Sequence, residues 1–438
     1  MWIMLVWGMG GCPLTWDQWQ APLGPPWDTN GNGLLDTSDL IGCLFNETDN
    51  VTFVNQLLDD SFVHGQGLEI ADIDGDLDMD VMVAYSLSDQ VVAYINGGDS
   101  TGGGTGTTWT TTEISLPGAI VATDVAIADF DGINGPDVAA VGLFDRNIGF
   151  SSAGEVTWYA NPGAAGSWTT NPITGLTFWG ALRLEAGDLT GEGRPDLVVA
   201  AIEATDGSGT PQPSGIWWFE NQGGAPLVWS TRRAVDGALQ HCNRAVIVDV
   251  DQDGILDIVG AGTYADELAW YENTRTGING NPIFSKHLIA TLDQPLDIMA
   301  TQMDGDPTPE VVVGYAHING FGALAWFDAP PDSTQLWTIH IIDLNYGVGE
   351  VHFCAGLFNN DSLTDIATTN FDISSGHAYL RDGSSWSPII PLVPAPFGMN
   401  HITCGDVTGD GRPDLLTTTY GNSSVDQVDI WINTPASD

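Results

Sequence analysis

The sequence has very few basic residues. Its 438 residues include 57 aspartates and glutamates but only 10 lysines and arginines, with Lys286 the single lysine, and the formal net charge is −47. A chain of this charge repels polyphosphates and anionic lipid headgroups. Nucleic-acid binding and docking to an anionic membrane surface are therefore excluded. The acidic excess is typical of a secreted protein in a saline or calcium-rich medium.

The chain also has few cysteines and no long apolar run. Its five cysteines are Cys12, Cys43, Cys242, Cys354 and Cys404. Their odd number and their spacing match no zinc site, and a Cys12–Cys43 disulfide and free thiols are alternatives. The apolar stretch 1–11 is shorter than the roughly 20 residues of a membrane span. We expect residues 1–27 to be a signal remnant or a proline-rich connector, and no segment to cross a membrane.

One acidic loop is abundant in the chain. Residues 249–257, Asp-Val-Asp-Gln-Asp-Gly-Ile-Leu-Asp, carry carboxylates at positions one, three, five and nine. Ca²⁺ takes roughly six to eight oxygen ligands, and the glycine permits a tight turn that aims alternate carboxylates inward. An EF-hand would need a glutamate at position twelve, where this chain has Gly260, and apolar β-branched residues precede that glycine. The loop is therefore predicted to bind calcium and to join two β-strands.

The same nine-residue loop occurs seven times. The copies begin at residues 72, 129, 188, 249, 302, 357 and 406. A period of roughly 55 residues, with turn residues inside it, predicts an array of four-stranded units. We label the strands of a unit A (before the loop), B (after it), C and D.

Aromatic residues mark two further strands in each unit. The first marker follows every loop, at Tyr94, Trp158, Trp218, Trp270, Trp326, Tyr379 and Trp431. A second follows each of these except the last, at Trp109, Trp168, Trp229, Phe284, Trp337 and Trp386. Phe53 stands before the first loop with no partner upstream, so the N-terminus supplies the outer strand that the last unit lacks. Such an array closes into a ring without exposed edges, which predicts an all-β, seven-bladed β-propeller over residues 51–435.

These motifs resemble the FG-GAP or VCBS repeat family. The carriers of the resemblance are the Asp-x-Asp-Gly-Asp loops and intervening strands such as Trp-Tyr-Glu-Asn at 270–273. Propellers of that family include the integrin α-subunit head, fungal lectins and some enzymes that act on polysaccharides. The resemblance implies Ca²⁺ ions that stabilise the A–B loops and take no part in catalysis, because fully coordinated Ca²⁺ has no open position. It does not specify the activity, because one fold hosts unrelated functions.

Carried over position by position, the resemblance implies calcium ligands in six of the seven loops. The first and fourth loops have complete sets of acids, the third and seventh have threonine at position three, and the second and fifth each lack one acid. The sixth loop, with Asn359, Asp361 and Asp365, is expected to be empty. The implied ligands are Asp72, Asp74, Asp76, Asp80, Asp129, Asp131, Asp137, Asp188, Thr190, Glu192, Asp196, Asp249, Asp251, Asp253, Asp257, Asp304, Asp306, Glu310, Asp406, Thr408, Asp410 and Asp414.

Residues 28–46 resemble one half of a dockerin. The EF-hand spacing is carried by Asp28, Asn30, Asn32, Asp36 and Asp39. The proline-rich segment before them cannot supply an entering helix, and only one copy is present. A calcium-stapled cap and a partner-binding element are therefore both open interpretations of this EF-hand-like segment.

A second set of polar residues lies five positions before each loop. These residues are Gly67, Asp124, Arg183, Arg244, Asp297, His352 and His401. Five strand residues span about 16 Å, so we expect this ring at the mouth of the central channel, on the face opposite the calcium loops. That face also carries the long B–C loops 144–155 and 203–214. The ring is either a set of salt bridges lining a solvated channel or a pocket for a sugar or acidic glycan, with a histidine for proton transfer.

Together these features predict a secreted or cell-surface, calcium-binding propeller that recognises a carbohydrate or a cell-surface protein. One alternative is a lyase or dehydratase that acts on sugars through Arg183, Arg244, His352 and His401. Another is a structural subunit of a surface layer or filament that self-assembles through residues 1–50.

Overall fold

The computed structural model describes sixteen segments of the chain. They are residues 51–97, 106–115, 121–142, 154–163, 166–174, 180–205, 210–277, 281–317, 321–330, 336–347, 351–359, 361–370, 375–386, 390–392, 398–420 and 426–435. The predicted N-terminal segment 1–27, the EF-hand-like segment 28–46 and the Cys12–Cys43 pair lie outside them. Within the described segments all secondary-structure elements are β-strands. These segments contain no helix that is long and apolar enough to cross a membrane.

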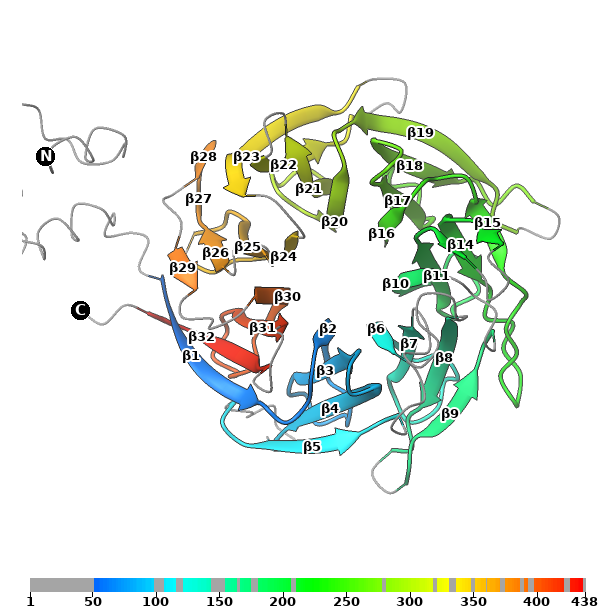
Figure 1. The fold of residues 1–438 in the computed structure, drawn as a ribbon, viewed down its shortest axis with the longest axis horizontal. Helices are drawn as coiled ribbons and strands as arrows, with labels where there is room; N and C mark the ends of the chain where they lie inside the picture. Colours follow the sequence, from blue (N-terminus) through cyan, green and yellow to red (C-terminus); the bar gives the residue numbers. More distant parts are fainter. Residues whose placement is uncertain are drawn as a thin grey trace, which may run out of the picture.

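The strands form seven four-stranded antiparallel sheets arranged in a ring (Figure 1). This confirms the predicted all-β, seven-bladed propeller. The innermost strands, A, are β2 (Gly65–Ala71), β6 (Ala122–Ala128), β10 (Ala181–Gly187), β16 (Cys242–Val248), β20 (Pro295–Thr301), β24 (Val351–Gly356) and β30 (Gly398–Gly405). The B strands are β3 (Asp80–Tyr85), β7 (Asp137–Gly142), β11 (Asp196–Ala201), β17 (Asp257–Gly262), β21 (Glu310–His317), β25 (Asp365–Asn370) and β31 (Asp414–Tyr420).

The remaining strands complete the blades toward the outside. The C strands are β4 (Gln90–Asn96), β8 (Glu155–Ala160), β14 (Gly215–Phe219), β18 (Glu267–Asn273), β22 (Phe321–Asp328), β26 (Ser375–Tyr379) and β32 (Val428–Pro435). The D strands are β5 (Trp109–Glu113), β9 (Thr169–Pro172), β15 (Arg233–Asp236), β19 (Phe284–Thr291), β23 (Thr338–Gly347), β29 (Ile390–Leu392) and β1 (Val51–Asp59). Two short ribbons add β12 (Ala204–Thr205) with β13 (Pro211–Gln212), and β27 (Arg381–Asp382) with β28 (Ser385–Trp386).

The ring closes through the first strand. β1 pairs antiparallel with β32, and Phe53 lies opposite Asn433, so the N-terminal strand is the outer strand of blade 7 as predicted. Figure 1 shows β1 running along the outside of β32. Closure leaves no open blade edge between the first and last repeats, which removes a site for edge-to-edge pairing.

Apolar side chains pack mainly between blades. Each of the seven apolar clusters joins residues of two neighbouring blades, so the core is a ring of seven interfaces. The aromatic residues that marked the C strands are all buried, with relative exposures between 1% for Tyr94 and 6% for Trp158. Cys242, Cys354 and Cys404 are free thiols in this core or at its edge.

A buried polar side chain, here called the latch, ties six of the seven blades to the blade before it. In blade 2 the Asn161 side chain, at the end of strand C, donates to the carbonyl oxygens of Ile73 (2.9 Å) in the blade 1 loop and of Pro136 (2.8 Å) in its own loop. Asparagines at the matching position bond in the same way to the second residue of the preceding loop, at Asn96, Asn221, Asn273 and Asn433. In blade 6 the guanidinium of Arg381 replaces the amide. This asparagine, the last residue of strands such as Trp-Tyr-Glu-Asn, was not predicted to have this role, although its recurrence in the sequence was a signal of one.

Replacement of the latch amide tests its contribution. Asn161→Ala is expected to destabilise the protein by roughly 1–3 kcal/mol, because it leaves two buried carbonyl groups without a donor. Urea unfolding measures the change. Asn171→Ala is the control, since the Asn171 amide bonds only to the exposed carbonyl of Thr169, and it should cost less than about 0.5 kcal/mol. Equal losses in the two variants would contradict the latch.

Candidate functional site

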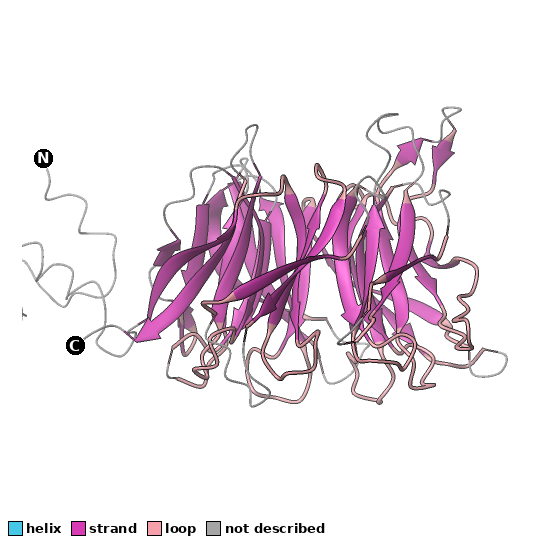
Figure 2. Cartoon of the chain, turned by 90° about the horizontal axis from the view of Figure 1, so that it is seen from below, coloured by secondary structure: helices cyan, strands magenta, loops and turns pink. Residues whose placement is uncertain are grey.

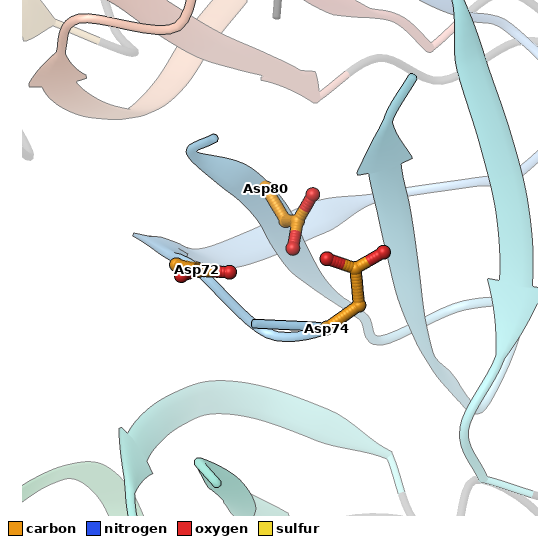
Figure 3. A group of neighbouring side chains, drawn as sticks. All are labelled: Asp72, Asp74 and Asp80. Atoms are coloured by element: carbon orange, nitrogen blue, oxygen red, sulfur yellow. The ribbon is translucent and has the colours of Figure 1, made fainter. Parts of the chain in front are cut away.

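The A–B loops gather carboxylates in four blades. In blade 1, carboxylate oxygens of Asp72, Asp74 and Asp80 lie within 4.8 Å of one another, and Figure 3 shows the three groups directed toward a common space. The same positions converge in blades 2 and 4, in the groups Asp129, Asp131, Asp137 and Asp249, Asp251, Asp257. Glycines make these turns possible: Gly75 has φ of 83° and Gly254 has φ of 82°, a region that glycine enters without strain.

Blade 5 gathers a different set of acids. Its group consists of Asp304, Glu310 and Asp328, and Asp328 comes from the end of strand C. Asp328 was not predicted from the sequence, because the loop pattern ends at position nine. Gln302, at position one, is turned to the loop backbone, where its amide accepts from the N–H of Gly305 (2.6 Å).

The position-five acids lie outside these groups. Asp76 accepts from the backbone N–H of Asp78 (3.0 Å), and Asp253 accepts from that of Ile255 (2.8 Å). In the third and seventh loops, Thr190 and Thr408 occupy position three. No group of three carboxylates is found there or in the sixth loop, as far as these loops are described. In the sixth loop the Asn359 amide donates to Asp361 (3.0 Å).

The chemistry of the four acidic groups fits a hard divalent cation. The pKa of Asp74 is raised by burial and by the charge of Asp76, and the pKa of Asp251 is raised by burial and by Asp253. Such carboxylates repel one another without a positive charge nearby. Two buried oxygens, Oδ1 of Asp249 and Oε1 of Glu310, have no hydrogen-bond partner among the described residues. Both features suit an oxygen-coordinated ion such as Ca²⁺.

The six polar residues of the ring predicted from the sequence are brought together around the axis. They lie one to three residues inside the A strands, and Asp124, Arg183, Asp297, His352 and His401 are between 1% and 9% exposed. The ring therefore lies near the start of the inner strands, on the side opposite the A–B loops. Its members come from six blades, and blade 1 has Gly67 at this position, which supplies no side chain.

Both arginines form ion pairs with carboxylates of the chain itself. Arg244 binds Asp124 (3.2 Å) and Glu185 (3.3 Å). Arg183 lies 3.8 Å from Asp124 and donates to the backbone oxygens of Gln66 (3.1 Å) and Thr123 (3.2 Å). Although burial lowers the pKa of Arg244, the charges of Glu185 and Asp124 raise it above its ordinary value. A ligand carboxylate would have to displace these partners.

The two histidines of the ring differ in their hydrogen-bond partners. His352 Nδ1 is 2.7 Å from Asp297 Oδ2, and its Nε2 is 3.3 Å from Arg183 Nη2. Because a guanidinium only donates, Nε2 accepts and Nδ1 carries the proton toward Asp297. The His401 ring lies 4.7 Å from that of His352, and its buried Nδ1 has no partner among the described residues. Burial and the neighbouring His352 lower the pKa of His401 well below its usual value.

Two glutamates of the site were not predicted. Glu69 and Glu185 stand three positions before their loops, two residues beyond the ring along the inner strands. Burial raises the pKa of Glu69 to about 8, with a further contribution from the charge of Glu185 against the lowering effect of Arg244. The pKa of Glu185 is also raised by burial. The sequence did contain a signal for these residues, since a glutamate stands three positions before the loop in two of the blades.

Comparison with known proteins agrees with this architecture. Residues 358–417 match the model of the FG-GAP-like repeat. This chain is a seven-bladed propeller with an FG-GAP-like repeat. No curated protein sequence matches it significantly.

Solved structures share the fold of this FG-GAP-like propeller at low identity. One is the crystal structure of BBS1N in complex with ARL6DN, with a TM-score of 0.51, 11% identity, and coverage of 88% of this chain and 97% of that chain. Another is the hydrazine synthase of Kuenenia stuttgartiensis, with a TM-score of 0.53, 11% identity, and coverage of 86% and 97%. At these identities the likeness shows the fold alone.

Removal of the charge at Glu69 should change how the stability of the FG-GAP-like propeller depends on pH. The folded-state pKa is about 8 and the ordinary value is 4.5, so ionised Glu69 is penalised on folding and wild-type stability falls as pH rises between these values. Glu69→Gln removes the penalty. Since a pKa unit is worth about 1.4 kcal/mol, we expect the advantage of the variant to widen by roughly 1–3 kcal/mol between about pH 5.5 and 9.

Urea unfolding across this pH range measures the effect. Glu113→Gln is the control, because Glu113 lies exposed on the outer strand β5. If the difference in unfolding free energy between Glu69→Gln and wild type does not change with pH, then burial does not penalise the ionised carboxyl group of Glu69.

Proposed function

We propose that this FG-GAP-like propeller is a secreted or cell-surface recognition protein, stabilised by calcium, that binds a carbohydrate or a cell-surface protein on the face opposite the A–B loops. The observation that carries the proposal is the pairing of charges around the axis. Arg183 and Arg244 are neutralised by acids and backbone oxygens of the chain itself. The charged residues around the axis thus stabilise the fold by pairing with one another. This favours a recognition site on the surface over one at the axis.

Calcium in the A–B loops is supported by the acidic groups of blades 1, 2, 4 and 5. Their oxygens converge within 4.8 Å, and two buried oxygens of these residues have no hydrogen-bond partner within the described part of the chain. The ligands implied by the third and seventh loops and by the EF-hand-like segment 28–46 extend the proposal. A bound ion would cancel the repulsion between carboxylates of neighbouring strands.

An extracellular location is supported by the kind of repeat and by composition. FG-GAP-like repeats are typical of extracellular proteins, and the matched segment covers the seventh A–B loop and all but the first residue of the sixth. The net charge of −47 suits a medium rich in salt or calcium. It also opposes nucleic acids as partners.

A sugar lyase or dehydratase is the second candidate. It is favoured by the Asp297 and His352 pair at 2.7 Å, which resembles the arrangement in which a carboxylate orients a histidine for proton transfer. The His401 ring lies beside His352, and its Nδ1 has no partner in the part of the chain that the structure describes. These groups are buried, so a substrate would need access through the layer of the inner strands.

Removal of calcium is expected to destabilise the protein. An ion at about 100 times its dissociation constant stabilises a folded protein by about 2.7 kcal/mol per site. Excess chelator should therefore lower the melting temperature, and added Ca²⁺ should restore it. Asp249→Asn should reduce the gain from Ca²⁺, whereas Asp361→Asn, in the loop expected to be empty, should leave the gain unchanged. A melting temperature that is unchanged by excess chelator would contradict the calcium proposal.

A binding screen combined with turnover assays separates the two candidates. Wild-type protein is expected to bind oligosaccharides or extracellular domains on an array without producing new reducing ends or unsaturated products. His352→Gln keeps a neutral side chain at the axis and should bind as the wild type does. Turnover of a bound glycan that disappears in His352→Gln would favour the enzyme.

A further inference from the structure

Tyr264 differs from the other aromatic side chains of the propeller. Its relative exposure is 60%, and it is the only aromatic residue among the exposed large apolar side chains of the described segments. The aromatic residues that mark the C strands are all buried. An aromatic ring left in water has no role in the packing of the blades, so its exposure needs another explanation.

The Tyr264 ring is held in place by a chain of contacts. It stacks on the His241 ring with centroids 4.0 Å apart and an interplanar angle of 28°. His241 Nδ1 lies 2.6 Å from Glu203 Oε2. The Ser214 hydroxyl lies within hydrogen-bonding distance of both Glu203 Oε1 (3.2 Å) and the Leu239 carbonyl oxygen (3.0 Å), and its single hydrogen is donated to one of them at a time. One ring face therefore rests on a braced histidine, and the exposed area belongs to the opposite face and the edge.

The backbone also fixes the relative position of the two rings. The N–H of Thr263, next to Tyr264, donates to the His241 carbonyl (2.9 Å). His241 and Asp266 both have φ of 54°, a left-handed conformation that is uncommon outside glycine. Asp266 in turn accepts from the N–H of Gln294 (3.0 Å). A conformation of this kind persists only where the surroundings enforce it.

This aromatic platform, Tyr264 on His241 with Glu203, joins two blades on the face opposite the A–B loops. His241 immediately precedes the inner strand β16, and Tyr264 lies in the connection between β17 and β18 of blade 4. Glu203 immediately precedes β12, the first strand of the ribbon inserted in the B–C connection of blade 3. Figure 2 shows the strands running between two faces that carry loops.

The chemistry around Tyr264 suits an uncharged sugar. The face of an aromatic ring carries partial negative charge, which attracts the partially positive C–H groups on one side of a pyranose. Glu203, which pairs with His241, and Asp266, two residues after Tyr264, are both exposed. Carboxylate oxygens accept more than one hydrogen bond, so they remain acceptors for sugar hydroxyls. A protein partner would favour a cluster of apolar anchors, whereas Tyr264 stands among polar neighbours. The same carboxylates repel uronates and sulfated glycans.

We propose that Tyr264, stacked on His241 and flanked by Glu203 and Asp266, is a binding site for a neutral pyranose of an oligosaccharide. This names the ligand class and the position of the recognition function proposed above, and it rests on that function.

An array of neutral and uronate-containing oligosaccharides, followed by calorimetric titration of the neutral oligosaccharide that binds most strongly, tests the site. Wild type is expected to prefer neutral glycans. Tyr264→Ala should weaken binding at least tenfold, because it removes the stacking surface, whereas Tyr264→Phe should stay within about threefold because it keeps the ring. Leu336→Ala, at an 88% exposed apolar side chain near the outer strand of blade 5, is the matched control and should bind as wild type does.

Saturation-transfer NMR adds a readout that a general loss of structure would not reproduce. Wild type and Tyr264→Phe should transfer magnetisation to C–H protons of one pyranose face, and Tyr264→Ala should not. If wild type binds a glycan and Tyr264→Ala binds it equally well, this site is wrong and the recognition function stands. Binding of uronates in preference to neutral glycans, or of proteins alone, also overturns the site. If wild type binds neither glycans nor proteins, the recognition function fails with it.

Discussion

The propeller depends on one buried interaction repeated around the ring: the carboxylate at the ninth position of each A–B loop. Its seven copies are at most 1% exposed. In blade 4, Asp257 accepts from the backbone N–H of Val250 in the loop (3.1 Å) and of Asn273 in strand C (2.7 Å). This carboxylate therefore joins the turn to the third strand of its own blade, and the adjacent asparagine side chain joins that strand to the preceding blade. A buried carboxylate is tolerated only when hydrogen bonds replace the lost water.

The buried ninth-position carboxylates also explain why a positive charge would stabilise the A–B loops. Burial raises the pKa of Asp257 to about 7 even though two backbone N–H groups lower it. The carboxylates at positions one and three lie close to this ninth-position carboxylate, whose ionisation burial already disfavours, and they repel it further. In blade 5 one oxygen of the longer Glu310 has no hydrogen-bond partner in the described segments, and Glu310 lies beside Asp328 from strand C. The scaffold interaction and the proposed metal sites thus share one set of residues.

Repetition separates scaffold from recognition in this molecule. The loop acids and the latch amides recur in most blades and serve packing. The residues around the axis differ between blades, yet Asp124, Arg183 and Arg244 satisfy one another, so variation alone does not mark a binding site. The platform at Tyr264 is both unrepeated and exposed, and that combination is what a surface site requires.

The sequence by itself determined the number of blades, their strand order and their closure. Loop spacing and the unpaired Phe53 sufficed, because each repeat must bury the same apolar pattern and an incomplete last blade needs an outer strand. Only the tertiary structure decided which side chains meet. Arg244 reaches Asp124 across two blade interfaces, and Tyr264 rests on His241 of the same blade, 23 positions earlier. Such contacts depend on blade packing and side-chain reach, and a one-dimensional pattern contains neither.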